Sequence, residues 1–182
     1  MTTDLNPSDV VGFWKAAGPD KWYAKNDAFD AACITHMLDA HLAAAARELD
    51  AWAETAEGSL ALLILLDQIP RNVYRGTAHQ FATDPLALQF ARRAVEAGHD
   101  QQIEGDIRRF CYMPFQHSED LADQEQSLKL FQAMDRDPSD RWAEHHHGVI
   151  ARFGRFPHRN AVLGRATTPE EAAFLKEDGF KG

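Results

Sequence analysis

Cysteine is scarce in this sequence. Its 182 residues include only Cys33 and Cys111, which form no C-x-x-C motif and supply no thiolate cluster for zinc. Two thiols in a chain of this length are typical of reduced packing residues in a cytoplasmic protein. We therefore expect a cytoplasmic location.

Long hydrophobic runs are missing as well. The longest, residues 60–66, is far shorter than the stretch of about 20 residues that crosses a bilayer. The N-terminal MTTDLNPSDV has neither the basic nor the apolar region of a secretory signal. We therefore expect no membrane partner.

Positive charge is in deficit over the whole chain. The formal net charge is -9, which argues against nucleic acid as a non-specific partner. Hydrophobic residues make up 45% of the chain and charged residues 26%, as is usual for a packed globular protein. At this length we expect a single domain, residues 1–182.

Acidic residues, in turn, are absent from two stretches, residues 68–83 and 145–169. Both are locally basic, and their cations are Arg rather than Lys. Arg is preferred where a planar donor binds a carboxylate or phosphate through two hydrogen bonds. The basic residues are Arg71, Arg75 and His79 in the first stretch, and His145, His146, His147, Arg152, Arg155, His158, Arg159 and Arg165 in the second.

Helix signals recur along the chain, and strand signals do not. We expect about eight helices with short connections, an all-α fold of antiparallel hairpins. They begin at Asn6-Pro7, Asn26, Gly58-Ser59, Thr83-Asp84-Pro85, about Gln101, Ser118, Asp137-Pro138 and the capping box Thr168-Pro169-Glu170-Glu171. They end at Gly18, about Leu49, Pro70, Gly98, Tyr112, an unassigned point after Met134, Gly154 and the C-terminal region.

The segment LALLILLDQI is apolar nearly all round, which predicts the central buried helix. Four further motifs are DQIPRNVYRG, FATDPLAL, YMPFQHSEDLADQE and RFGRFPHRNAVLGR. With these motifs the chain resembles the uncharacterised bacterial family known as domain of unknown function 924. The resemblance implies a tetratricopeptide-like α-α superhelix in a small cytoplasmic protein, and no assigned reaction. It places His146 at the position of the family's usual His, and Ile69 where Phe is common.

DQIPRNVYRG follows the central helix and permits two interpretations. Asp67 lies in the last turn, where a carboxylate needs a cation to offset the helix dipole. In the structural interpretation Arg71 or a distant Arg neutralises Asp67, while Asn72 and Arg75 cap orphan carbonyls. In the functional one, Arg71, Asn72 and Arg75 reach into a pocket and clamp a carboxylate or phosphate.

FGRFPHRN is a loop whose aromatic residues would hold its polar ones in place. Preorganised donors lose little entropy on binding, so Arg155, Arg159 and Asn160 are candidate ligands of an anion. We expect His158 to titrate near neutrality, so that it could act as an acid or base. In the structural interpretation Arg155 and Arg159 pair with Asp67, Glu119 or Asp120.

YMPFQHSEDLADQE enters a helix. Ser118 is a natural N-cap, and acidic residues are favoured in the first turn. His117 is not explained in this way, and with Glu119 it could shuttle a proton, although a structural His fits equally well.

Metal and cofactor motifs are weak or absent. Glu96-x-x-His99 and Glu144-x-x-His147 have di-iron spacing, but Gly98 interrupts the first and chance accounts for both. H-E-x-x-H, P-loop, nucleophile-elbow and dinucleotide-binding patterns are missing. We expect no metal and no cofactor.

Three functions remain open. The first is a binding module for an anionic small molecule or peptide carboxylate. The second is a hydrolase or transferase on a phosphorylated or carboxylated substrate, with His158 or His117 as the acid or base and Glu119 or Asp67 as the orienting carboxylate. The third is a structural or interaction protein in which the motifs form an internal ion-pair hub.

Overall fold

The computed structural model describes residues 4–134 and 141–178. Within these ranges the chain forms ten α-helices and no β-strand, so the predicted all-α fold is confirmed. No helix there is long and apolar enough to span a membrane. The tetratricopeptide-like arrangement and the single-domain organisation stay predictions.

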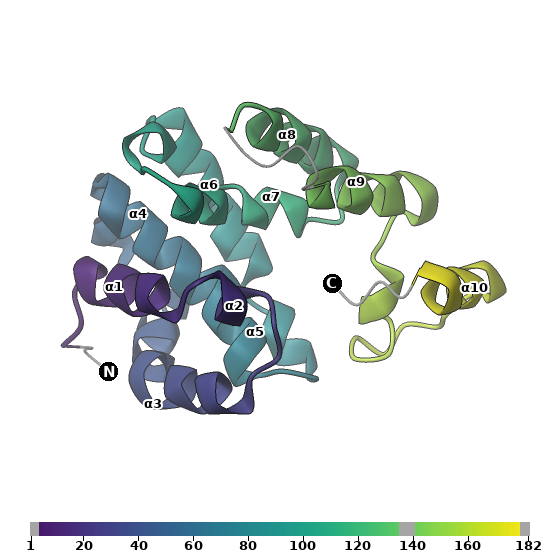
Figure 1. Ribbon diagram of the computed structural model, residues 1–182, viewed down its shortest axis with the longest axis horizontal. Coiled ribbons are helices and arrows are strands. Elements are labelled where there is room, and N and C mark those ends of the chain that lie inside the picture. The colour runs from purple at the N-terminus through teal and green to yellow at the C-terminus, as the bar shows by residue number, and fades with distance from the viewer. Residues whose placement is uncertain (1–3, 135–140, 179–182) are drawn as a thin grey trace. The chain divides into compact units, whose positions relative to one another are not determined.

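The chain divides into two compact units (Figure 1). The first comprises residues 1–75 and 79–114, and the second residues 76–78 and 115–182. Helices of the first unit are α1 (Pro7–Ala17), α2 (Pro19–Trp22), α3 (Asp27–Ala45), α4 (Ala56–Leu63), α5 (Ile69–Val73) and α6 (Asp84–Glu96). Helix α7 (Met113–Gln116) leads into the second unit, which holds α8 (Leu121–Gln132), α9 (Trp142–Phe153) and α10 (Pro169–Asp178).

Local capping sets several helix ends. Asn6 accepts a hydrogen bond from the backbone N–H of Asp9, and Asn26 accepts one from Phe29, as expected for N-caps. Gly154 ends α9 in the left-handed conformation, with a φ of 66°, where glycine has no steric penalty. These predictions are confirmed, while the expected start at Asp137-Pro138 lies outside the described residues.

The central helix differs from the prediction. Pro70 does not end it, because a π-helical turn, Ile64–Gln68, separates α4 from α5. The N–H of Ile69 donates to the carbonyl of Ile64, and Pro70 then lies in a new first turn where no N–H is required. The run from Leu60 to Pro70 is buried throughout, which confirms its central position. π-Bulges occur frequently at functional sites, and this one carries Asp67.

Other helix boundaries also need correction. Helix α3 ends at Ala45 rather than near Leu49, because Arg47 adopts a left-handed conformation with a φ of 68°. Helix α8 is capped by Asp120 rather than by Ser118. The Ser118 hydroxyl instead accepts a hydrogen bond from the N–H of Asp120. Leu121, the first residue of α8, is 43% exposed.

The segment near residues 101–112 is not an α-helix. It forms two 3₁₀ segments, Asp100–Gln102 and Asp106–Cys111. Gly105 separates them with a φ of 75°, a left-handed conformation that an α-helix cannot contain. Pro114 follows this segment and lies in the first turn of α7, a position that proline tolerates.

Gly58 should be the glycine least tolerant of a side chain. A Cβ there would lie 2.0 Å from the carbonyl oxygen of Trp52, which is backbone and cannot move aside alone. We expect Gly58→Ala to lower the free energy of unfolding by about 2–3 kcal/mol in urea titrations. Gly12→Ala is the control, because a Cβ there meets nothing within 4 Å. This variant should raise the free energy of unfolding by about 1 kcal/mol, since Ala favours the helix more than Gly does. Equal effects of the two variants would contradict the close approach.

Candidate functional site

The first polar cluster surrounds Arg71 at the end of the central helix, in the first unit. Asp67 is 1% exposed, and its Oδ1 lies 3.4 Å from Arg71 Nη1. Arg71 also binds both carboxylate oxygens of Asp84, at 3.0 and 3.1 Å. Burial opposes the charged guanidinium, but the two carboxylates raise the pKa of Arg71 above its ordinary value. The predicted neutralisation of Asp67 by Arg71 is confirmed, and Asp84 is an unpredicted partner.

Asn72 and Arg75 extend this cluster in different ways. Asn72 Nδ2 donates to the carbonyl of Gln68 at 3.1 Å, which confirms its capping role. Arg75 was expected to cap a carbonyl as well, and this is wrong. Its Nε and Nη2 donate to the carboxylate of Asp30 at 2.7 and 2.8 Å, because a bidentate carboxylate is a stronger acceptor than a neutral carbonyl.

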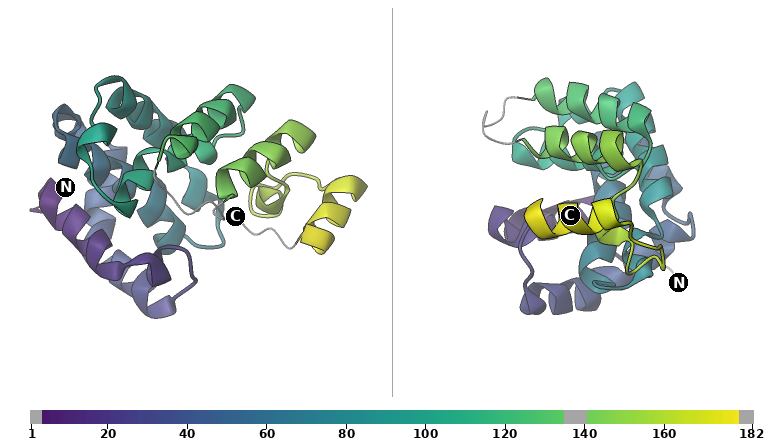
Figure 2. Two further views of the ribbon diagram at one scale, coloured as in Figure 1. Left: turned by 45° about the horizontal axis from the view of Figure 1, so that its top comes forward. Right: turned by 90° about the vertical axis from the view of Figure 1, so that its right-hand side faces the viewer.

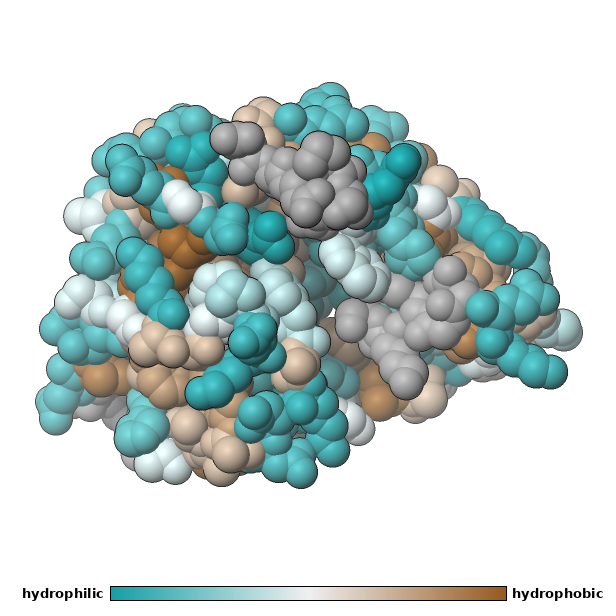
Figure 3. All heavy atoms as spheres, in the orientation of Figure 1, coloured by the Kyte–Doolittle hydropathy of each residue, from teal (hydrophilic) through white to brown (hydrophobic). Residues whose placement is uncertain are grey.

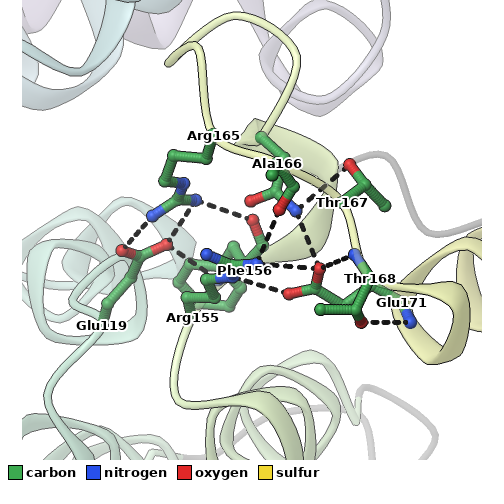
Figure 4. A network of polar contacts seen from close by, with 9 residues as sticks. Glu119, Arg155, Phe156, Arg165, Ala166, Thr167, Thr168 and Glu171 are labelled. Carbon is green, nitrogen blue, oxygen red and sulfur yellow. Dashed lines mark hydrogen bonds and ion pairs between the residues drawn. The ribbon is translucent and has the colours of Figure 1, made fainter.

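The second polar cluster lies in the second unit and is built on two carboxylates (Figure 4). Glu119 accepts two hydrogen bonds from Arg165, at 2.7 and 3.0 Å. Its Oε1 also accepts the backbone N–H of Phe156 at 2.7 Å. Burial opposes ionisation, but these donors lower the pKa of Glu119 below its ordinary value. Glu119 therefore anchors the backbone of the FGRFPHRN loop.

Glu171 is the other carboxylate of this cluster. It accepts hydrogen bonds from Arg155 at 2.6 and 2.9 Å, from Asn160 at 3.1 Å and from the N–H of Thr168 at 2.8 Å. Arg155 is the main reason that the pKa of Glu171 falls to about 2, although burial opposes the fall. The backbone N–H of Glu171 donates to Thr168 Oγ1, which confirms the predicted capping box. Glu171 thus joins α10 to the loop.

The structural interpretation of this loop named the wrong carboxylate. Arg155 was expected to pair with Asp67, Glu119 or Asp120, and it pairs with Glu171. Arg165, noted in the sequence only as part of a basic stretch, takes Glu119. Glu171 had a visible local role as a capping residue, but no sequence spacing indicated that it would also bind Arg155 and Asn160.

A third group of side chains surrounds Phe156, which is fully buried. The Arg159 guanidinium lies over its ring, 4.6 Å from the centroid, within the range of a cation–π contact. The rings of His146 and His158 each lie 5.5 Å from it, centroid to centroid. His117 lies 6.4 Å from His146. All four polar residues had been singled out in the sequence. The fold places Arg159, His146 and His158 around one aromatic ring, with His117 beside His146.

Both histidines beside Phe156 are held neutral. Burial lowers the pKa of His158 to about 3, assisted by Arg159 and His117 and opposed by Glu119. Burial and His117 lower the pKa of His146 to about 3, while its Nδ1 donates to the carbonyl of Trp142 at 2.7 Å. The expectation that His158 titrates near neutrality is therefore wrong, because the sequence does not reveal its burial among cations.

A metal site would need several ligating side chains close together. Within residues 4–134 and 141–178, no three His, Cys, Asp or Glu side chains are grouped so that they could hold a metal ion.

The predicted site residues fall into two sets. Asp67, Arg71, Asn72 and Arg75 belong to the first unit, and His117, Glu119, His146, Arg155, His158, Arg159 and Asn160 belong to the second.

Comparison with known proteins identifies the family. A family model described as bacterial protein of unknown function (DUF924) matches residues 10–179. A solved structure of a protein of unknown function, ATU0120 from Agrobacterium tumefaciens, is 54% identical, with a TM-score of 0.90 over 94% of this chain and 97% of that one. No curated protein matches the chain. The chain belongs to the DUF924 family of bacterial proteins of unknown function, as its four motifs predicted.

Proposed function

We propose that the chain is a binding module that captures a small anion, a phosphate or a carboxylate, beside Phe156. Arg159, His158, His146 and His117 would line this place, and Asn160 and Arg155 would position the loop through Glu171. The proposal rests on one observation: the Arg159 guanidinium and two imidazoles gather around a buried ring. The ligand itself would be bound by charge-assisted hydrogen bonds.

The electrostatics of this corner support an anionic ligand. Arg159, His117 and Arg165 all lower the pKa of His158, and they outweigh the opposing effect of Glu119. A proton on His158 is therefore disfavoured by a local excess of positive charge as well as by burial. An anion would be attracted by the same positive charges, while burial, the largest cause of the shift, opposes a charge of either sign.

Inorganic phosphate and acetate are suitable probes. We expect each to raise the melting temperature in a concentration-dependent way, with a saturable heat in calorimetry. Arg159→Gln should abolish both effects in a protein that still shows the wild-type circular dichroism spectrum. Arg152→Gln is the control, because Arg152 is exposed and pairs with Glu170. Unchanged binding in Arg159→Gln, or no response of the wild type to either anion, would contradict the proposal.

The enzyme hypothesis has weaker support. A neutral imidazole whose pKa is about 3 accepts a proton poorly at neutral pH. Glu119, the expected orienting residue, is occupied by Arg165 and the Phe156 N–H. Hydrolase or transferase activity stays an alternative, to be tested by turnover of phosphorylated or carboxylated compounds that His158→Ala abolishes without unfolding the protein.

The structural hypothesis has support of its own. Arg155, Arg165, Arg71 and Arg75 are each bound to carboxylates within their own unit, as an internal ion-pair hub requires. That role and anion capture by Arg159 are compatible. A ligand-binding role of Asp67, Arg71, Asn72 and Arg75, taken within the first unit by itself, also stays a proposal.

Three broader expectations are kept as proposals. The free, buried thiols of Cys33 and Cys111 support a cytoplasmic location. The packing of helices in pairs within each unit, such as α3 with α5 and α8 with α9, supports a tetratricopeptide-like superhelix. The acidic overall charge disfavours nucleic acid and anionic membrane surfaces as partners, so the proposed partner is a small molecule or a peptide.

A further inference from the structure

The buried side of α8 is largely polar. Its buried residues are Asp123, Gln124, Ser127 and Phe131. The outward side of the helix is mostly hydrophilic as well (Figure 3, top), whereas the inner side of such a helix is normally apolar. Polar groups are costly to bury unless hydrogen bonds compensate them, so each of these polar side chains should have partners.

Asp123 and Gln124 hold the loop that carries His117. Gln124 Nε2 donates to the carbonyl oxygens of Gln116 and Ser118, at 2.8 and 2.7 Å, and these two residues flank His117. Asp123 Oδ2 accepts a hydrogen bond from the hydroxyl of Ser118 at 2.8 Å. The Gln124 amide therefore lies beside the backbone of a residue that is proposed to line the anion site.

The amide of Gln124 leaves a buried oxygen without a donor. Because Nε2 faces two carbonyl oxygens, which can only accept, the nitrogen and the oxygen of this amide cannot be exchanged. Gln124 is fully buried, and no donor in residues 4–134 and 141–178 lies within hydrogen-bond distance of its Oε1. Ser127, one turn further along the same face, is also fully buried, and its Oγ has no partner in those residues either. A buried acceptor without a donor points to a bound group that supplies one.

Asn160 repeats this arrangement next to Arg159 in the chain. Its Nδ2 donates to Glu171 Oε2 at 3.1 Å and to Thr167 Oγ1 at 3.4 Å. Since a carboxylate can only accept, the contact with Glu171 fixes the orientation of this amide too. Asn160 is fully buried, and among the described residues nothing donates to its Oδ1. Two loops of the proposed anion site are thus each held by a buried amide whose oxygen requires a donor.

The two amides belong to the elements that surround Phe156. Helices α8 and α9 lie side by side in each view (Figures 1 and 2). Helix α9 carries His146, whose ring lies 6.4 Å from that of His117 and 5.5 Å from that of Phe156, centroid to centroid. All of these residues belong to the second unit. A ligand beside Phe156 would therefore meet positive charge and buried acceptor oxygens in the same part of this unit.

We propose that the ligand is a hydroxylated acid, whose anionic group lies beside Phe156 and whose hydroxyl groups donate to Gln124 Oε1 and Asn160 Oδ1. This inference rests on the anion-binding function proposed above. A hydroxyl group both donates and accepts, so the one that donates to Gln124 accepts the hydrogen of Ser127 Oγ in return.

Charge selects hydroxyl groups over an ammonium group as the donors. Arg159 and Arg165 both oppose a proton on His158, and the same positive charges would repel an ammonium group. A hydroxyl group carries no charge and is not repelled. An acid without hydroxyl groups, such as acetate, would leave both amide oxygens without a donor, which weakens binding.

Matched pairs of acids test this inference by calorimetry. Glycolate and glycerate are acetate and propionate with added hydroxyl groups, and we expect each to bind about tenfold tighter than its parent acid. Equal affinities within both pairs would overturn the inference and leave the anion-binding function standing. A chain that binds none of the four acids would contradict both.

Two variants test the residues that receive the hydroxyl group. Ser127→Ala should reduce the preference for glycolate over acetate severalfold and leave the affinity for acetate unchanged. Gln124→Met should abolish the preference, and circular dichroism reports whether this variant, which also loses its bonds to the His117 loop, is folded. Ser8→Ala, at an exposed position, is the matched control and should keep the full preference. Full preference in Ser127→Ala, or in folded Gln124→Met, would overturn the proposal.

A crystal structure with glycerate distinguishes the ligand from water as the partner of these oxygens. A glycerate hydroxyl group within hydrogen-bond distance of Gln124 Oε1 or Asn160 Oδ1 is the expected result. Buried water is the usual partner of such groups. An ordered water that bonds Gln124 and Ser127 and stays in place while glycerate is bound would refute the proposal.

Discussion

Replacing Glu171 by Ala should lower the free energy of unfolding by about 3 kcal/mol, because removing one partner of a buried ion pair leaves the other polar groups poorly compensated. The Glu171 side chain is 3% exposed, and it accepts hydrogen bonds from Arg155, Asn160 and the N–H of Thr168 (Figure 4). The loss is placed at the lower end of the usual range because Arg155 is 29% exposed. Urea unfolding followed by circular dichroism measures it.

Glu170→Ala provides the matched control one residue away. Glu170 pairs with Arg152, but their side chains are 65% and 54% exposed, and exposed ion pairs contribute little. We expect a change below about 0.5 kcal/mol for this variant. If the two variants are equally stable, Glu171 is not the residue that joins α10 to the FGRFPHRN loop.

The stability contributed by Glu171 should depend on pH. Its pKa falls from the ordinary 4.5 to about 2 in the folded chain, so the folded state binds a proton less readily than the unfolded state. The contribution is therefore complete above about pH 4.5 and is lost as the pH falls towards 2. The difference in stability between the wild type and Glu171→Gln should narrow over that interval.

The features predicted well from the sequence are those that a few neighbouring residues decide. The caps at Asn6 and Asn26 and the box of Thr168 and Glu171 each need only a side chain and an N–H three residues away. The π-helical turn before Ile69 was missed because its hydrogen bonds depend on how the buried helix packs. Ser118 and Asp120 both qualify as N-caps, and the pattern alone could not rank them.

The candidate site was predicted as a set of residues but not as a set of contacts. Arg155, Arg159 and His158 were singled out because Arg and His gather in one basic stretch, and Glu119 because it lies beside His117. Which carboxylate each Arg would meet depends on helix positions that spacing does not encode, so Arg155 was paired wrongly. Burial is equally non-local, which is why the shift in the pKa of His158 could not be foreseen.

The chain should begin to lose stability at a higher pH than protonation of its carboxylates alone would cause, because His146 and His158 are held neutral in the folded state. The pKa of each falls from the ordinary 6.5 to about 3, so the unfolded state takes up protons that the folded state does not. Stability is therefore lost as the pH falls from about 6.5 towards 3. For His146, which is 5% exposed, the loss between pH 7 and pH 5 should be about 2 kcal/mol. His158 is less buried and contributes less.

His146→Gln isolates this effect, because an amide has no proton to gain in this range and can still donate to the carbonyl of Trp142. Urea unfolding of the wild type and the variant at pH 7 and pH 5 should show a smaller loss in the variant, by about 2 kcal/mol. His36→Gln, at an exposed position, should follow the wild type. Parallel curves for His146→Gln and the wild type would mean that His146 is free to protonate in the folded chain. The measurement reports mainly the burial of His146, which is the largest cause of its lowered pKa, and to a smaller extent the positive charge of His117.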